Sequence, residues 1–373
     1  MKTRWERGSW KKTALAFALV CAGAQAQVMV GQTAGFTGPV AAGVKETTEG
    51  ARLWFDAVNA KGGIAGQPVE LVSLDDKFDP KLAAENAKQL VEQRNVVALF
   101  LTRGTPHTQA VLPLLEAHKV PLVAPSTGAM VLHEPVPKYV FNVRATYQRE
   151  AEKAVEHLHT LGMRRIAVVH ADDSFGADAL AGANKGFAKT RMGAAAVVKA
   201  DREKPDYAKI VPVLTAAQAQ AVLWIGSAKV VAQGVKALRG AKSAAHVVTL
   251  SNNASSGFIK ELGEHSRGVI VTQVFPNERS IAYPMVKEAM ELAKAKGVEL
   301  SPAMLEGYAA AKVLVEGLKR AGKNPTREKL QAALEGMKRF DLGGLEVTYG
   351  PADHTGLDFA DLSIVDLEGR FVR

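Results

Sequence analysis

Short apolar segments alternate with segments of helical spacing along most of this 373-residue chain, and this alternation limits the folds open to it. Val28–Ala34, Val69–Leu74 and Val96–Leu101 are predicted strands, each followed by a predicted amphipathic helix. The same order repeats between residues 166 and 250. Such repetition predicts a parallel α/β architecture. Because no low-complexity linker separates the two halves, we expect two closely connected lobes.

The turns after several predicted strands are rich in glycine and hydroxyl side chains. They comprise residues Gly31–Pro39, Leu101–Pro106 and Ala124–Gly128. Open parallel sheets bind ligands at the carboxyl ends of their strands, where helix N-termini present unpaired N–H groups. The sequence therefore predicts a site for a small molecule at these turns.

Four polar side chains in these turns have two interpretations each. Thr105 precedes Pro106 at the start of a predicted helix, so its hydroxyl either binds a ligand carboxylate or caps the helix. The same alternatives apply to Ser126 and Thr127. Arg103 either pairs with an anion or is a solvated surface charge. Two hydroxyl-rich turns after neighbouring strands favour one shared site.

The first 26 residues have the pattern of a secretory signal. A basic segment is followed by the apolar run Ala14–Gly23 and by Ala24-Gln25-Ala26, which fits a cleavage site before Gln27. The alternative is lipidation at Cys21, which the bulky Val20 disfavours. We therefore expect export to the periplasm and removal of residues 1–26. Cys21 is the only cysteine, so the mature chain is expected to contain no disulfide and no thiolate nucleophile.

The formal net charge of +9 overstates the basic character of the mature chain. Residues 1–26 contain five Lys/Arg and one Glu, which leaves +5 for the rest. These charges alternate in sign along predicted helices, and no Lys/Arg run is interleaved with aromatic residues. We therefore expect no binding of nucleic acid.

Catalytic and metal-binding signatures are missing from the sequence. It contains neither His-Glu-x-x-His nor Gly-x-Ser-x-Gly. Gly317–Lys323 fits part of a phosphate loop, but Asn324 replaces the required Ser or Thr, and Gly322 is expected to end a helix. The acidic pairs at 75–76 and 172–173 are more typical of turns and caps than of catalysis. We expect no metal, no cofactor and no enzymatic activity.

Seven short motifs, in their order and spacing, give the chain a more specific resemblance. They are Thr37–Pro39, Asn59–Gly66, Asp75–Pro80, Val123–Thr127, Tyr147–Gln148, Asp173–Gly176 and Glu306–Ala311. Nearly the whole mature chain resembles the leucine/isoleucine/valine-binding family of periplasmic binding proteins, the receptors of ABC importers. The resemblance implies two doubly wound parallel-sheet lobes, formed by 27–145 with 276–350 and by 146–275 with 351–373. Three crossover strands, near 144–147, 273–277 and 349–353, would join them.

The resemblance also implies ligand-binding residues. A carboxylate in this family is held by positions that match Thr105, Ser126, Thr127 and Gly128, and an aromatic residue matching Phe175 lies over the ligand. Trp224 and Ser227 match a further pocket loop, although Phe175 and Trp224 would also suit the core. Thr37, in the first motif, is another candidate.

Two departures from the family pattern concern the ligand. Asn252-Asn253 stands where amino-acid binders place an acidic partner for the ligand ammonium, and Gly43 stands where an aromatic residue is common. A buried ammonium without a carboxylate partner is costly. Asn252 is therefore a candidate ligand-binding residue that favours a neutral amide, an aromatic acid or another small carboxylate over branched-chain amino acids.

The function expected from these observations is solute capture without chemistry. The leading hypothesis is a monomeric periplasmic receptor that delivers a small carboxylate- or amide-containing solute to the permease subunits of an ABC importer. The alternatives are a periplasmic sensor that presents its closed form to a signalling protein and an amide hydrolase.

Overall fold

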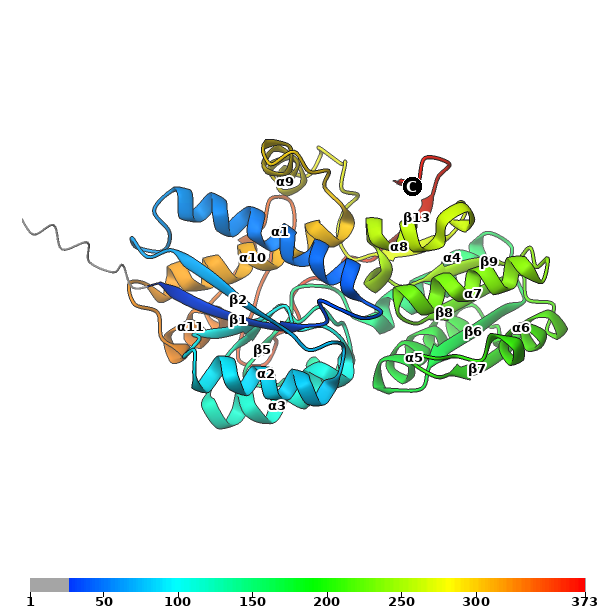
Figure 1. Ribbon diagram of the computed structural model, residues 1–373, viewed down its shortest axis with the longest axis horizontal. Coiled ribbons are helices and arrows are strands. Elements are labelled where there is room, and N and C mark those ends of the chain that lie inside the picture. The colour runs from blue at the N-terminus through cyan, green and yellow to red at the C-terminus, as the bar shows by residue number, and fades with distance from the viewer. Residues whose placement is uncertain (1–26, 373) are drawn as a thin grey trace, which may run out of the picture.

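Two separate sheets organise the computed structural model, which describes residues 27–372 (Figure 1). Each sheet has helices on both faces, which confirms the prediction of two doubly wound α/β lobes. The predicted signal segment, residues 1–26, lies outside the described residues.

The first lobe is built on a five-stranded parallel sheet in the order β2-β1-β3-β4-β5. The strands are β1 (Val28–Ala34), β2 (Val69–Asp75), β3 (Ala98–Phe100), β4 (Leu122–Val123) and β5 (Val140–Phe141). The helices are α1 (Ala41–Ala60), α2 (Pro80–Glu92), α3 (Thr105–His118), α9 (Pro284–Ala295), α10 (Pro302–Ala321) and α11 (Arg327–Glu335). Helices α1 and α10 pack on one face of the sheet, and α2 and α3 pack on the other. A short turn η1 (Met130–Leu132) and the hairpin β11 (Phe340–Asp341) and β12 (Glu346–Val347) complete the lobe.

The second lobe is built on a seven-stranded sheet in the order β14-β13-β10-β9-β8-β6-β7. Its parallel strands are β6 (Ile166–Ala171), β7 (Ala196–Ala200), β8 (Ala221–Ile225), β9 (His246–Thr249) and β10 (Ile270–Gln273). The two antiparallel strands are β13 (Asp361–Val365) and β14 (Phe371–Val372). Its helices are α4 (Tyr147–Thr160), α5 (Ser174–Lys189), α6 (Tyr207–Ala216), α7 (Ala228–Gly240) and α8 (Ser256–Leu262), with the short turns η2 (Ser251–Asn253) and η3 (Gly263–His265).

The chain passes between the lobes three times. The passages lie between β5 and α4, between β10 and α9, and between β12 and β13. The first and third run side by side, because the Asn142 N–H donates to the His354 carbonyl and the Leu357 N–H donates to the Val143 carbonyl. Leu357 still packs in the first-lobe core, so the third passage is completed beyond it.

Local sequence signals set several helix boundaries. The Asp79 carboxylate accepts hydrogen bonds from the N–H groups of Lys81 and Leu82 and so caps α2, while Pro80 occupies the first helical position. Gly322 follows the end of α10 with a φ of 80°, so the Gly317–Lys323 segment ends a helix, as expected. Helix α4 begins at Tyr147, where the Thr146 hydroxyl accepts a hydrogen bond from the Arg149 N–H and caps the helix.

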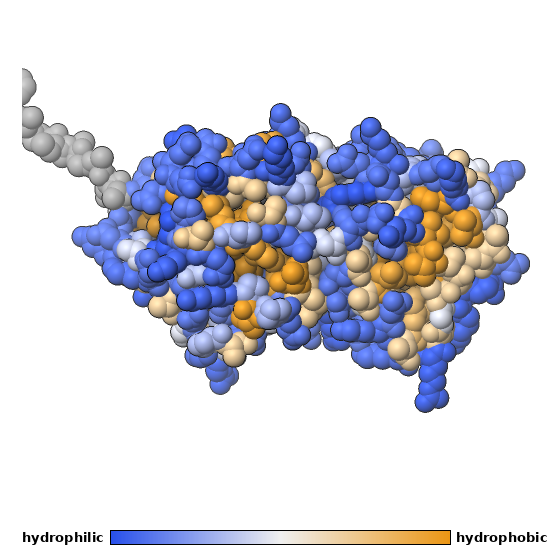
Figure 2. All heavy atoms as spheres, turned by 90° about the horizontal axis from the view of Figure 1, so that it is seen from below, coloured by the Kyte–Doolittle hydropathy of each residue, from blue (hydrophilic) through white to orange (hydrophobic). Residues whose placement is uncertain are grey.

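Most of the molecular face drawn in Figure 2 is hydrophilic, with separate hydrophobic areas on each lobe. The large hydrophobic side chains that are exposed are scattered over both lobes and include Leu161, Val197, Ile281 and Leu367. Within residues 27–372 no helix combines the length and the apolar character needed to cross a membrane.

Candidate functional site

Two neighbouring strand ends of the first lobe turn sharply and bring Arg103 and Ser126 together. Leu101 follows β3 with a φ of 50°, and Ala124 follows β4 with a φ of 53°. Positive φ is uncommon for residues other than glycine and concentrates at functional sites. The two segments then form a parallel bridge between Arg103 and Ser126. The turns predicted from sequence therefore do form one shared corner.

A narrow cavity of about 20 Å³ lies between the lobes next to this corner. Four first-lobe residues line it: Val40, Phe78, Arg103 and Gly104. Six residues of the second lobe complete it: Tyr147, Ala171, Phe175, Arg202, Ser227 and Asn252. A cavity of this volume holds one or two water molecules. A larger solute enters only when the lobes separate or when side chains in the cavity move.

The hydroxyl groups of the corner bond to the protein itself in this structure. The Thr105 and Thr127 hydroxyls form a hydrogen bond of 2.7 Å, and neither side chain lines the cavity. The Ser126 oxygen accepts from Arg103 Nη1 at 2.8 Å and donates to Glu306 Oε1 at 2.7 Å. A hydroxyl has one proton to donate, so in this arrangement Ser126 positions Arg103 rather than contacting a solute.

Glu306 reaches Ser126 because α10 packs unusually close to α1. A Cβ atom at Gly307 would lie 1.7 Å from the Thr47 carbonyl oxygen, a distance that only glycine at this position avoids. The sequence Glu306-Gly307 thus combines a close helix contact with an acidic side chain directed at the corner.

Arg103 is the most prominent charged group of the cavity. It is only 6% exposed, and its Nη2 donates across the interlobe boundary to the Asn252 carbonyl oxygen at 2.5 Å. Within the described part of the chain it forms no ion pair with a carboxylate. A buried guanidinium is ordinarily paired, so Arg103 is the candidate partner for an anionic group in this cavity.

A second arginine, Arg202, approaches the cavity from the other lobe. It forms an ion pair with Asp173, and its guanidinium carbon lies 4.5 Å from the centroid of the Phe78 ring in the first lobe. Burial lowers the pKa of Arg202 to about 10, so it stays protonated near neutral pH. This cation–π contact joins the two lobes.

Aromatic side chains form much of the cavity wall. The Tyr147 and Phe175 rings meet edge to face at 4.8 Å, and the Arg144 guanidinium lies 4.6 Å from the Tyr147 ring. Phe78 is held at a φ of 61° by a hydrogen bond from its N–H to the buried Asp76 carboxylate. Burial raises the pKa of Asp76 to about 6.

Two buried, uncharged polar atoms of the second-lobe lining have no hydrogen-bond partner in the described residues. They are the hydroxyl of Ser227 and Oδ1 of Asn252. The Asn252 amide nitrogen donates to the Gly226 carbonyl and to Asn253 Oδ1. Because both of these partners are acceptors, they fix the orientation of the amide and leave its oxygen available.

Further contacts between the lobes surround the cavity. The Glu46 carboxylate of α1 accepts from the N–H groups of Ser256 and Gly257 in α8, at 3.0 and 2.8 Å. The Ser174 hydroxyl of α5 donates to Gln109 of α3 at 2.6 Å. These bonds describe a closed arrangement of the lobes.

The structure divides the candidate residues from the sequence into groups. Phe175 and Asn252 line the cavity, whereas Thr105, Ser126 and Thr127 form the buried corner behind Arg103. Gly128 contacts the first passage between the lobes, because its carbonyl accepts from the Tyr147 N–H and a Cβ there would lie 2.6 Å from the Ala145 carbonyl oxygen.

Two of the candidates require correction. Trp224 is 1% exposed and fills the second-lobe core against Gly234 of α7, because alternate residues of β8 point to opposite faces of the sheet. Thr37 lies at the surface, where its hydroxyl and N–H donate to Asp75. Neither lines the cavity.

Phe78, Tyr147 and Arg202 line the cavity but were not among the site residues predicted from the sequence. Arg202 had a usable signal, since it follows the carboxyl end of β7. Phe78 had none, because its place in the cavity depends on the unusual backbone after Asp76. Within residues 27–372, no group of three or more His, Cys, Asp or Glu side chains is arranged to hold a metal ion.

Comparisons with known proteins agree with this geometry. The periplasmic binding protein family matches residues 27–366. A Leu/Ile/Val-binding protein homologue of Brucella melitensis is 26% identical over 332 residues, which cover 87% of this chain and 88% of that protein. The crystal structure of a substrate-binding periplasmic protein of Ralstonia solanacearum is 30% identical with a TM-score of 0.85, over 93% of this chain and 99% of that one. The crystal structure of a possible leucine/isoleucine/valine-binding protein of Rhodopirellula baltica is 25% identical with a TM-score of 0.86, over 94% of this chain and 97% of that one. These relatives are binding proteins rather than enzymes, and the chain belongs to the periplasmic binding protein family.

Proposed function

We propose that the mature chain is a periplasmic receptor that captures a small carboxylate- or amide-containing solute between its lobes and delivers it to the permease subunits of an ABC importer. The observation that carries this proposal is the cavity between the lobes, which residues at the strand ends of both sheets line together. A solute bound there contacts both lobes at once, so it stabilises the closed form.

The groups that line the cavity suit binding better than catalysis. In the described chain the lining comprises apolar side chains, two arginines, an amide and two hydroxyls. No histidine, lysine or carboxylate is among them, so the Ser227 hydroxyl has no adjacent base to activate it as a nucleophile. The proposal therefore assigns no reaction to this site.

The corner residues Thr105, Ser126, Thr127 and Gly128 remain proposed binding residues in the open form. When the lobes separate, the bond between Arg103 and the Asn252 carbonyl is lost, and the corner is exposed to an entering solute. The names of relatives point to branched-chain amino acids, but Asn252 provides no negative charge for an ammonium group. We therefore propose that this receptor takes a different solute.

Mass spectrometry and a thermal-shift screen test the binding step. Gently purified protein is measured under native conditions and again after denaturation, so that any retained solute is released and identified. A screen of amino acids, amides and carboxylic acids should then contain compounds that stabilise the protein by about 2.7 kcal/mol at 100 times their dissociation constant. If the native protein retains nothing and no compound stabilises it, the receptor proposal is wrong.

Uptake by cells tests delivery to the importer. Deleting the gene for this chain should abolish high-affinity import of the stabilising solute, and restoring the gene should restore import. Unchanged import in the deletion strain would contradict the transport step.

A further inference from the structure

We infer that the captured solute is a small organic monocarboxylate whose second polar group is a neutral hydrogen-bond donor, and that Arg103 binds its carboxylate. The inference rests on the proposed function and specifies the chemistry of the same cavity. The first polar group of the solute is a carboxylate rather than an amide. The second is a neutral donor, a hydroxyl or an amide N–H, rather than an ammonium.

The charges around the cavity call for one carboxylate. Arg202 already pairs with Asp173. Within residues 27–372 Arg103 forms no direct ion pair with an acid. The Ser126 hydroxyl that accepts from Arg103 donates in turn to the Glu306 carboxylate, which lies on its far side. One arginine in the lining thus remains without a carboxylate of its own, which suits a single negative charge on the solute.

Arg103 has the donors and the position for this role. Two of its five N–H groups donate to Ser126 and to the Asn252 carbonyl, which leaves three for a solute. The bond to Asn252 crosses the interlobe boundary and breaks when the lobes separate. A carboxylate that enters the open cleft replaces that carbonyl with a charged acceptor, and charge-assisted bonds to arginine are stronger than neutral ones.

Asn252 determines the second polar group. Its side-chain oxygen, like the Ser227 hydroxyl, is a buried acceptor of the lining without a partner in the described residues, and the two acceptors bonded to its amide nitrogen prevent the amide from reversing. A neutral oxygen accepts from a hydroxyl or an amide N–H but does not offset a full positive charge. With two guanidinium groups in the same lining, an ammonium is disfavoured.

The walls determine the body of the solute. Phe78, Tyr147 and Phe175 present aromatic surface, and Val40 and Ala171 add aliphatic surface. An apolar or aromatic skeleton between the two polar groups therefore fits the site.

Matched compounds on a common skeleton test the inference with the wild-type protein. The probes are 3-phenyllactate, 3-phenylpropanoate, phenylalanine and 3-phenyllactamide, together with the corresponding four compounds on the leucine skeleton. Calorimetry should give the tightest binding for a hydroxy acid. The acid without the hydroxyl should bind more weakly, and the amide and the amino acid at least about tenfold more weakly than the hydroxy acid. If an amino acid or an amide binds as tightly as its hydroxy acid, or if no carboxylate in either series binds, the inference is overturned.

Substitutions at Arg103 test its role separately. Arg103→Gln should weaken hydroxy-acid binding by at least about tenfold and amide binding by a smaller factor, because a neutral amide oxygen forms a weaker bond to arginine than a carboxylate does, while Arg103→Lys should retain part of the hydroxy-acid affinity. The matched control is Arg52→Gln, which removes one positive charge from an exposed position of α1. Equal hydroxy-acid affinity in wild type and a folded Arg103→Gln protein would overturn the role of Arg103. If Arg103→Gln does not fold, the compound series and the hydroxy-acid affinity of Arg103→Lys test the role of Arg103 instead, and wild-type affinity in Arg103→Lys would contradict a bidentate contact to the carboxylate.

The outcomes separate this inference from the receptor proposal. Retention or stabilisation by an amino acid or an amide alone refutes the inference and leaves solute capture intact. Failure of every solute in the native and thermal measurements refutes both.

Discussion

Substituting Gly257 with alanine should oppose closure of the lobes without disturbing either lobe. Gly257 lies in α8 of the second lobe, and a Cβ atom there would be 2.2 Å from the Cβ of Ala42 in α1 of the first lobe. Its other two near neighbours, Glu46 Oε1 and Ala42 Cα, also belong to the first lobe. The collision therefore exists only when the lobes are closed.

The magnitude follows from the contact distances. Carbon atoms in contact are about 3.5–4.0 Å apart, so the two Cβ atoms must separate by roughly 1.3 Å or more. Overpacking of this kind costs about 1–3 kcal/mol. Because a form with separated lobes does not bear this cost, the dissociation constant should rise about 5- to 150-fold. The melting temperature of the solute-free protein should be unchanged or higher, since alanine favours a helix over glycine by up to about 1 kcal/mol.

Calorimetry with the most strongly stabilising solute measures the affinity, and small-angle scattering measures closure. Wild type should show a smaller radius of gyration with solute, and Gly257→Ala should show a smaller change. Gly240→Ala in α7 is the matched control, because a Cβ at that position meets no atom within 4 Å. Adding Ala42→Gly removes the colliding Cβ and should restore affinity to the Gly257→Ala protein. Unchanged affinity in the single variant, or no recovery in the double variant, would refute closure in this geometry.

Three further predictions concern the interlobe contacts, the hydroxyl corner and a buried acid. Glu46→Ala should lower solute affinity about tenfold, because two charge-assisted bonds to α8 are lost. Glu49→Ala, at an exposed position of the same helix, should leave the affinity unchanged. Equal affinities of the two variants would show that the Glu46 bonds to α8 do not stabilise the closed form. Thr105→Ala should also lower solute affinity about tenfold, because the hydrogen-bonded Thr105 and Thr127 hydroxyls have one proton left to donate to the solute. Thr105→Ser should preserve the affinity. A Thr105→Ala protein with lower stability but unchanged affinity would show that the hydroxyl pair stabilises only the interior of the lobe. Burial raises the pKa of Asp76 from 3.8 to about 6, so the folded protein binds this proton more tightly than the unfolded chain. Relative to Asp76→Asn, the wild type should therefore lose up to about 3 kcal/mol of unfolding free energy as the pH rises from 4 to 7. Urea titrations measure the unfolding free energy of both proteins at each pH, and a difference between them that does not change with pH would exclude this effect.

The alternation of apolar segments was sufficient to predict the fold, because the central strands of each sheet, such as β3, β6 and β8, are buried on both faces. The strand Val28–Ala34 matches its predicted limits, and β2 extends one residue beyond the predicted Val69–Leu74. The strand predicted at 96–101 is shorter in the structure, Ala98–Phe100, and the left-handed turn at Leu101 accounts for its carboxyl end. Apolar spacing identifies what is buried, but it does not locate a change in backbone conformation.

The site was harder to predict because it depends on direction and on distance between lobes. Trp224 lies one residue from the end of β8, yet its side chain points to the face covered by α7, where Gly234 leaves room for the indole. Arg202 and Phe78 are far apart in sequence and meet only when the lobes close. Hydroxyl-rich turns identify the binding edge of the sheet, whereas the cavity lining requires the three-dimensional arrangement.

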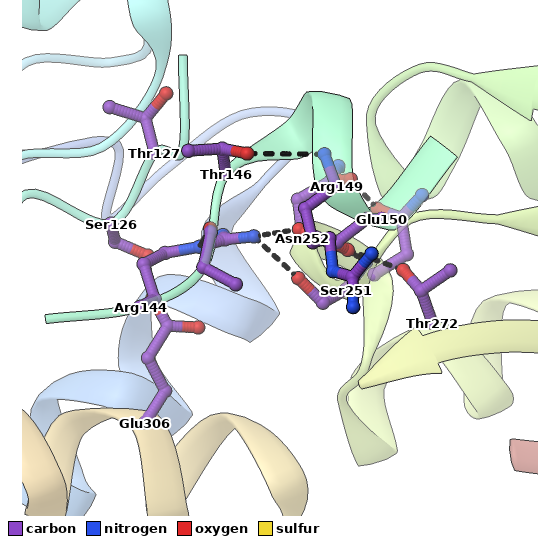
Figure 3. A network of polar contacts seen from close by, with 12 residues as sticks. Ser126, Thr127, Arg144, Thr146, Arg149, Glu150, Ser251, Asn252, Thr272 and Glu306 are labelled. Atoms are coloured by element: carbon purple, nitrogen blue, oxygen red, sulfur yellow. Dashed lines mark hydrogen bonds and ion pairs between the residues drawn. The ribbon is translucent and has the colours of Figure 1, made fainter. Parts of the chain in front are cut away.

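A buried ionic network explains how the second lobe keeps its side of the cavity fixed during closure. Arg144, on the first passage, pairs with Glu150 of α4 and donates to the Ser251 hydroxyl at 2.7 Å (Figure 3). Glu150 also accepts from the Ser251 N–H and from the Thr272 hydroxyl of β10.

The network joins the ends of two passages to the turn that carries Asn252, and Arg144 also supports the Tyr147 ring. Removing one partner of a buried ion pair typically costs about 3–5 kcal/mol, so such a cluster does not rearrange easily. Bending is then confined to the passages beyond it, toward the first lobe. Asn252, Tyr147 and Phe175 therefore move with the second lobe as one rigid unit, and closure changes their distance to Arg103 and Phe78 of the first lobe without changing their mutual arrangement.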